Sequence, residues 1–197
     1  MSTTTWVLLV LAVLVLFWAV GAYNRLVRLK NAIANAFGQI DVQLKRRYDL
    51  IPNLVEVARK YLAHEAQTLE AVIAARNQAR SAEQTAAGAP LNAGAIGALV
   101  GAEQVLGGAL VRLFAVAEAY PDLKADQTMR ELSEELSSTE NRIGFARQAY
   151  NDHVLEFNDA AAQFPTLIVA RLFGFQPLSM LQSTSSAAER QPVKVTF

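Results

Sequence analysis

The sequence predicts an all-α protein in which one N-terminal transmembrane helix continues into an antiparallel up-and-down bundle of three to four long helices. Three observations predict this class. An uncharged apolar stretch fills residues 1–23, two long segments repeat apolar residues at steps of three and four, and Gly and Pro gather between those segments. Steps of three and four place side chains on one face of a helix, so each segment is expected to bury an apolar stripe.

Residues 1–23 are expected to form a membrane anchor. The run from Trp6 to Tyr23 has no charged side chain. With Thr3–Thr5 it reaches roughly 32 Å as a helix, which matches a hydrocarbon core of about 30 Å. The alternative is a cleaved signal peptide with Ala19 and Gly21 as the small residues of its cleavage site. That alternative lacks the positive charge with which signal peptides begin.

Three basic residues, Arg25, Arg28 and Lys30, follow the apolar stretch, and the first acidic residue is Asp41. Lys and Arg beside a span are retained on the cytoplasmic side of the membrane. The short N-terminus is therefore expected outside, and the bundle domain, residues 24–181, in the cytoplasm. The same basic residues can contact anionic lipid headgroups.

The first long helix is predicted over about residues 24–80. Its apolar stripe keeps one phase across Pro52, which inside a helix lacks the N–H that would bond the carbonyl of Tyr48. A kinked but continuous helix is therefore expected, with a break into two helices at Pro52 as the alternative. The stripe consists of Leu26, Ile33, Phe37, Ile40, Leu44, Tyr48, Ile51, Val55, Ala58 and Leu62.

Small residues dominate the middle of the chain. A loop is predicted at residues 86–94 because Gly and Pro cluster there, and a helix is predicted at 95–120. Gly97 and Gly101 are four residues apart, a spacing that allows close contact between helices, within the bundle or between copies. Glu103 is the only charged residue in 93–111, so insertion of this segment into the membrane is a third interpretation.

Pro121 is expected to open the next long helix, at residues 122–164, because its fixed φ suits a first helical turn. A short helix is predicted at 166–175, after Pro165. We expect the two long stripes to pair as in a coiled coil. The polar residues 182–197 are expected to form a flexible tail. The second stripe consists of Met129, Leu132, Leu136, Thr139, Ile143, Ala146, Tyr150, Val154, Phe157, Ala161 and Phe164.

A polar ladder runs beside the second stripe, at Glu140, Arg147, Asn151 and Asn158. Polar groups between bundle helices often fix the register of those helices. A structural polar network with the first long helix is therefore predicted, and a buried catalytic site that includes Tyr150 is the alternative. The predicted network comprises Asp41, Arg47, Asp49, Glu140, Arg147 and Asn151.

Composition excludes several kinds of chemistry. The chain has no Cys, which removes disulfides, Cys-ligated zinc and thiol nucleophiles. The residues three positions before His64 and His153 are tyrosines, so the Glu-x-x-His pattern of di-iron bundles is absent. Lys plus Arg and Asp plus Glu each number 18, which gives none of the basic excess of nucleic-acid binders. No catalytic residue, metal site or cofactor is expected, and the protein is predicted not to be an enzyme.

Two blocks of sequence resemble a known family. The first is YNRLV at Tyr23–Val27 with IDVQLKRRYDLIPNLVEVARKYLAHE at Ile40–Glu65. The second is YPDLKA at Tyr120–Ala125, STENRIGFARQAYNDHVLEFN at Ser138–Asn158, and LFGF at Leu172–Phe175. Together they are similar to the LemA family of bacterial membrane proteins over nearly the whole chain. The resemblance implies one N-terminal span, a short extracellular N-terminus and a soluble antiparallel bundle at the bacterial inner membrane.

The expected function is that of a membrane-anchored, non-enzymatic scaffold or adaptor. Its bundle would present helical faces to further copies, as a homo-oligomer, or to other membrane proteins. The alternative is a membrane-surface module that binds or remodels lipid. That module would use Arg25, Arg28, Lys30, Arg46, Arg47 and the apolar segment Leu167–Leu181.

Overall fold

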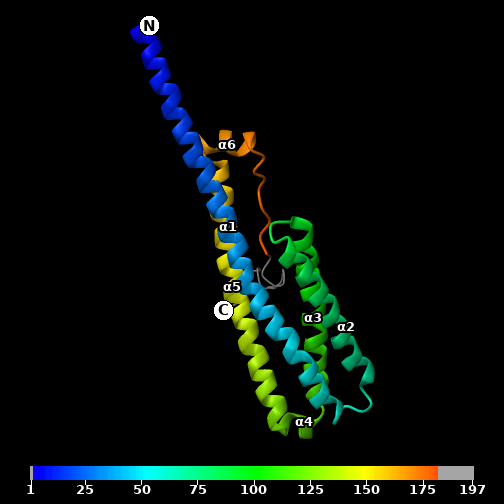
Figure 1. Cartoon of the computed structure of the whole chain (residues 1–197). Coiled ribbons are helices and arrows are strands. Elements are labelled where there is room, and N and C mark those ends of the chain that lie inside the picture. Colours follow the sequence, from blue (N-terminus) through cyan, green and yellow to red (C-terminus); the bar gives the residue numbers. More distant parts are fainter. Residues whose placement is uncertain (1, 182–197) are drawn as a thin grey trace, which may run out of the picture.

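The fold is an elongated bundle with one helix projecting from its end, as the computed structural model shows for residues 2–181 (Figure 1). The predicted fold class is confirmed, because every regular element within these residues is helical and successive long helices alternate in direction. The predicted flexible tail, 182–197, lies outside the described residues. The helices are α1 (Thr3–Arg59), α2 (Ala66–Gly88), α3 (Ala93–Ala117), α4 (Pro121–Ala125), α5 (Gln127–Ala162) and α6 (Thr166–Leu172).

Helix α1 joins the apolar N-terminal stretch to the bundle without interruption. The side chains from Trp6 to Phe17 are all exposed, and Leu26 is the first buried residue of the helix. Length and composition would allow α1 and α3 to cross a membrane, and only the apolar window of α1 is entirely uncovered by the rest of the chain. The apolar part of α1 therefore matches the predicted anchor, and the bundle begins within one turn of its end.

The predicted continuity of the first helix through Pro52 is confirmed. The carbonyl of Tyr48, which has no N–H from residue 52 to accept, instead accepts a hydrogen bond of 2.9 Å from Arg76 Nε on α2. Pro52 thus leaves the Tyr48 carbonyl without its helical donor, and Arg76 of the neighbouring helix donates to it instead.

The expected single helix over 24–80 is wrong beyond Arg59. The chain turns at residues 60–65, and α2 folds back against α1. This turn contains no Gly or Pro, so no local signal marks it. Packing decides it, because folding back buries Leu62 in the turn and Leu69, Val72 and Ala79 on α2.

The other boundaries differ from expectation by a few residues. Asn92 caps α3 by accepting from the Ala95 N–H, which shortens the predicted loop to residues 89–92. The predicted helix 122–164 is divided at Asp126, whose carboxylate caps α5 by accepting from the Met129 N–H at 2.9 Å. Helix α6 ends at Leu172 rather than at residue 175, and Gly174 follows with a φ of 70°.

The core lies along two packed pairs of helices. Helix α1 packs most extensively on α5, and α2 packs most extensively on α3. The predicted stripe of α1 is buried throughout, and the rings of Phe37 and Tyr150 meet at 6.2 Å across the α1–α5 seam. In the second stripe Phe164 is an exception. It lies beyond the end of α5 and is 81% exposed.

Replacing Arg76 with Ala should lower the free energy of unfolding by about 1–2 kcal/mol, because the Tyr48 carbonyl loses its donor. In a Pro52→Ala background the same change should cost less, since the N–H of residue 52 can then bond that carbonyl. Urea unfolding of the four proteins in detergent, followed by circular dichroism, measures this coupling. Equal losses in both backgrounds would contradict the proposed compensation.

Candidate functional site

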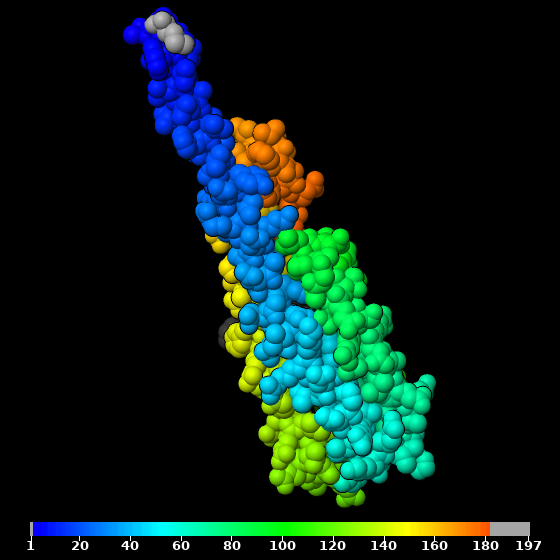
Figure 2. Space-filling model, in the orientation of Figure 1, coloured from blue at the N-terminus to red at the C-terminus, as the bar shows by residue number. Residues whose placement is uncertain are grey.

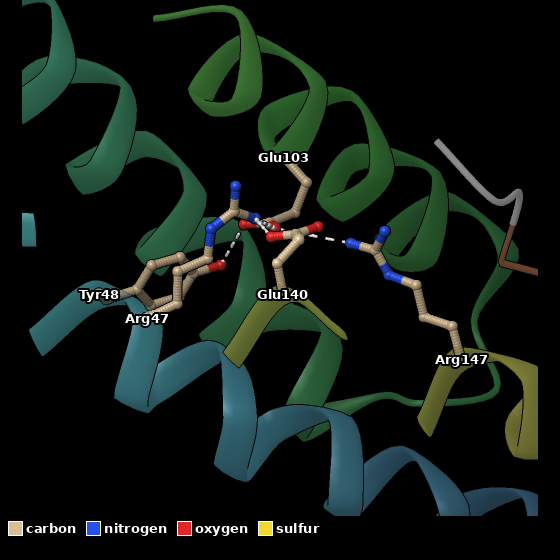
Figure 3. A network of polar contacts seen from close by, with 5 residues as sticks. All are labelled: Arg47, Tyr48, Glu103, Glu140 and Arg147. Atoms are coloured by element: carbon tan, nitrogen blue, oxygen red, sulfur yellow. Dashed lines mark hydrogen bonds and ion pairs between the residues drawn. The ribbon is translucent and has the colours of Figure 1, made fainter. Parts of the chain in front are cut away.

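The main polar cluster of the bundle is centred on Glu103, on α3. Its side chain is 2% exposed and receives donors from two other helices. Arg47 Nη1 lies 2.6 Å from Oε2, and the Tyr48 hydroxyl donates to Oε1 at 2.6 Å. Arg147 Nη2, from α5, lies 3.5 Å from Oε2 (Figure 3). One carboxylate therefore ties α3 to both helices of the α1–α5 pair.

Glu140 completes this Glu103 cluster at its outer edge. Its Oε2 lies 3.2 Å from Arg47 Nη1, and its side chain is partly exposed. Two carboxylates thus face two guanidinium groups, so the cluster is balanced in charge. Burial, with the nearby Glu103 carboxylate, raises the pKa of Tyr48 far above its ordinary value, so its hydroxyl remains a donor.

A groove opens beside the cluster, between α3 and α5. These two helices make few direct contacts, because each packs on another partner. The groove has a volume of about 460 Å³, with Arg47, Glu103 and Glu140 at one side and small or apolar residues around them. The apolar lining includes Gly107, Gly108, Leu110, Val111, Phe114 and Leu136.

A second polar cluster joins α1 to α2. Lys45 Nζ lies 2.6 Å from Asp41 Oδ2 and 3.8 Å from Glu83 Oε1. Burial raises the pKa of Glu83 to about 7, and a hydrogen bond to Asp41 adds to this increase. Burial alone would raise the pKa of Asp41, but hydrogen bonds with Glu83 and Lys45 outweigh it and lower that pKa. Below about pH 7 Glu83 therefore keeps its proton while Asp41 is ionised.

Two asparagines of α5 hold the extended segment that follows α6. Asn158 donates to the Leu178 carbonyl at 2.9 Å and accepts from the Leu178 N–H at 2.8 Å. Asn151 makes the same pair of bonds with Leu181, both at 2.8 Å. Seven helical residues span about 10.5 Å, and three extended residues span about 10 Å, so the two spacings match.

The structure assigns the six predicted network residues to four different places. Arg47, Glu140 and Arg147 do meet, but around Glu103. Asp41 belongs to the cluster with Lys45 and Glu83. Asp49 is exposed at the surface, 3.9 Å from Arg76, and Asn151 binds backbone instead of a charged group. The six residues therefore belong to separate contacts, because a sequence gives the face of each residue but not its partner on another helix.

The sequence pattern did not identify Glu103 as the centre of the polar cluster. Its signal in the sequence was that it is the only charge in a long run of small and apolar residues. A lone carboxylate in such a helix requires a buried cation, and Arg47 and Arg147 supply it. This arrangement also argues against the interpretation of 93–111 as a membrane insertion.

Gly97 and Gly101 do not form the expected close helix contact within the chain. Both are exposed, and a Cβ built at either residue would meet no atom within 4 Å. The basic residues Arg25, Arg28 and Lys30 are exposed beside the end of the apolar run, as a contact with headgroups requires.

The other basic pair proposed for lipid contact is already paired with acidic side chains. Arg46 Nη2 lies 2.6 Å from Glu135 Oε1, and Arg47 is buried beside Glu103. Arg47 is therefore buried away from the surface, whereas the side chain of Arg46 is 53% exposed.

The chemistry of the Glu103 cluster is that of a structural joint. The Glu103 carboxylate is engaged by three donors, which are two guanidinium groups and the Tyr48 hydroxyl. Within residues 2–181, no group of three His, Asp or Glu side chains is arranged to hold a metal ion.

Comparison with known proteins gives one family and several relatives. The model of the LemA family matches residues 36–197. The magnetosome protein MamQ of Magnetospirillum gryphiswaldense is 27% identical over 169 residues, which cover 78% of this chain and 62% of that protein. MamQ 2 of Paramagnetospirillum magneticum is 26% identical over 178 residues, covering 81% of this chain and 64% of that protein. The chain thus spans less than two thirds of the length of these relatives.

Replacing Glu103 with Ala should lower the free energy of unfolding by about 3–5 kcal/mol, because Arg47 and Arg147 would be left buried near a missing partner. The matched control is Glu135→Ala, which removes the surface pair with Arg46 and should cost at most about 1 kcal/mol. Urea unfolding in detergent measures both. Similar losses for the two variants would contradict the central role of Glu103.

The stability of the protein should fall as pH rises from about 5 to about 8, because folding raises the pKa of Glu83 from 4.5 to about 7. The stabilisation from its bound proton is complete below the unfolded pKa and is lost as pH passes the folded one. Glu83→Gln should abolish this dependence, which amounts to about 2–3 kcal/mol. Unfolding curves across this pH range test it, and an unchanged slope in the variant would contradict the assignment.

Proposed function

We propose that this chain, which belongs to the LemA family, is a membrane-anchored, non-enzymatic scaffold whose bundle self-associates through α3. Association with membrane is supported by the apolar half of α1. The self-association rests on one observation, which is the character of the surface that α3 leaves uncovered.

The outer face of α3 has no charged residue from Ala93 to Val111, although it is exposed. Water-facing surfaces of bundle helices normally carry charges, as α5 does with Arg142, Asp152 and Glu156. Contiguous apolar or small-residue surface on a soluble domain favours contact with another protein. This α3 outer face consists of Gly97, Ala98, Gly101, Gln104, Val105, Gly108 and Val111.

The small residues of this face suit a helix as the partner. A Cβ at Gly97, Gly101 or Gly108 would meet nothing within 4 Å, so a second helix could approach the backbone closely. Gly108 and Val111 also line the groove beside the Glu103 cluster, which gives the approaching helix a continuous depression. A second copy of the chain presents the same face, and such a self-complementary contact closes as a two-fold dimer.

Membrane insertion of α3 is the competing explanation of the same apolar face. It would require Glu103 to leave Arg47, Tyr48 and Arg147 and to enter hydrocarbon, where an unpaired carboxylate is costly. Packing against protein leaves the Glu103 cluster intact, so we favour it.

A scaffold also agrees with the chemistry of the described residues. The buried Glu103 carboxylate is engaged by Arg47, Tyr48 and Arg147, and these contacts join three helices. We place the bundle on the cytoplasmic side of the bacterial inner membrane, because Arg25, Arg28 and Lys30 are exposed where α1 leaves the apolar run. Contact with other membrane proteins and the absence of nucleic-acid binding remain parts of this proposal.

Single-cysteine variants test the α3 contact directly, because the natural chain has no Cys. Val105→Cys should give a covalent dimer with a short bis-maleimide in native membranes. Val42→Cys on α1 is the matched control, since the two valines are 54% and 57% exposed, and it should remain monomeric. The readout is the mass of the product on a denaturing gel.

Substitution at Gly101 provides the control for folding. Gly101→Ala should keep the dimer, and Gly101→Glu should weaken it while leaving helicity unchanged, since neither side chain meets an atom of its own chain. Light scattering in detergent gives the mass of each. A monomeric wild type with no crosslink from Val105→Cys would overturn the proposed self-association.

A further inference from the structure

A second unexplained apolar surface lies on and around α6. Val169 and Ala170 face the bundle and are buried. The other side of this short helix and its flanks expose large apolar side chains, with Phe164 at 81% and Leu172 at 77%. Ile168 and Phe173 are also more than half exposed. The α6 apolar surface, meaning these four residues, is therefore left uncovered by the described chain.

The position of α6 along α1 coincides with the end of the apolar run. The ring of Tyr23, the last residue of that run, lies 4.9 Å from the ring of Phe173 and 5.6 Å from that of Phe175. Helix α6 extends sideways from α1 at the end of the bundle from which the N-terminal segment projects (Figures 1 and 2). No spacer separates the two parts, because Leu26 is already buried in the bundle.

The structure holds α6 in this position from both ends. The Phe164–Pro165 turn connects it to α5, and Val169 and Ala170 pack on the bundle. After Gly174 the chain is fixed again by Asn158, which makes two hydrogen bonds to Leu178. Helix α6 and the segment after it are therefore packed and hydrogen-bonded parts of the bundle.

The exposed charged side chains on α6 and on the adjoining turns of α1 are basic, as is suitable for contact with lipid headgroups. Arg171 is exposed on α6 itself, and Arg25, Arg28 and Lys30 are exposed on the adjoining turns of α1. The first acidic residue of α1 is Asp41, several turns further into the bundle. Apolar side chains at the boundary of the acyl region, with basic residues around them, are typical of interfacial helices.

We propose that the α6 apolar surface lies in the interfacial layer of the bilayer that α1 spans, as a second membrane contact of the same chain. Phe164, Ile168, Leu172 and Phe173 enter the boundary between headgroups and acyl chains, and the basic residues contact lipid phosphates. Two contacts at one level fix the rotation and tilt of the bundle relative to the membrane, which a single helix cannot do. This assignment holds for either orientation of the chain across the membrane.

Spin labels on single cysteines test the depth of α6 in the full chain, reconstituted in nanodiscs of phosphatidylcholine and phosphatidylglycerol. The label replaces Leu172, with Leu14 in the span as the reference for lipid and Phe145 as the reference for water. Phe145 is the matched control, because it is 74% exposed and lies 17 residues, about 25 Å of helix, before the end of α5 at Ala162. Collision rates with apolar oxygen and with water-soluble nickel chelate give the depth of each label.

The label at Leu172 should collide with oxygen more often, and with the nickel chelate several-fold less often, than the label at Phe145. Equal accessibility at Leu172 and Phe145 would overturn the proposal, because α6 would then face water. Shielding of Leu172 from both reagents would also overturn it, because the occupant would then be protein, such as a second copy.

A double variant tests whether apolar contact holds α6 in the membrane. Ile168→Asp with Leu172→Asp should move a label at Phe164 into water, seen as a several-fold rise in its collision rate with the nickel chelate. Phe145→Asp is the control and should leave that label at its original depth. Circular dichroism verifies the fold, and crosslinking through Val105→Cys should persist, which separates this proposal from self-association. An unchanged depth of the Phe164 label in the double variant would overturn the proposal.

Discussion

The burial of one carboxylate, Glu103, constrains the whole arrangement of α3. A charge that leaves water must be paired and hydrogen-bonded, and the only way α3 achieves this is to place Glu103 between Arg47, Tyr48 and Arg147. That pairing fixes the rotation of α3 about its own axis. It turns the uncharged residues of the helix outward, where they form the face that we propose for self-association, and it opposes transfer of α3 into lipid.

The same logic connects the bundle to the membrane. Helix α1 passes from its apolar run to the bundle core within one turn, so the proposed span would place that end of the bundle at the bilayer surface. Helix α6 occupies this end, with Phe173 beside Tyr23 and with Asn158 of α5 binding Leu178 in the segment that follows. In the proposed arrangement the α6 end of the bundle faces lipid, and the lateral face on α3 contacts a second copy.

Much of this fold could be predicted from local pattern. The anchor, the continuity through Pro52 and the buried stripe of α1 all followed from hydropathy and from steps of three and four, since these depend only on neighbours along one helix. The turn at residues 60–65 could not be predicted in this way. Its residues favour helix, and the chain leaves that conformation because α2 buries more apolar surface by returning along α1.

In the candidate site, the polar residues could be predicted from the sequence, but their partners could not. Arg47, Glu140 and Arg147 were recognised as polar residues beside a seam, and Asn151 as a member of a regular ladder. By itself the sequence determined that the chain is helical, which residues form the two long apolar stripes, and that the N-terminal segment suits a membrane. Only the tertiary structure decided that Glu103 is the common partner, that Asn151 and Asn158 hold backbone, and that α6 lies level with Tyr23. Helical periodicity is set by neighbours in sequence, whereas pairing of charges depends on distances between helices that periodicity does not contain.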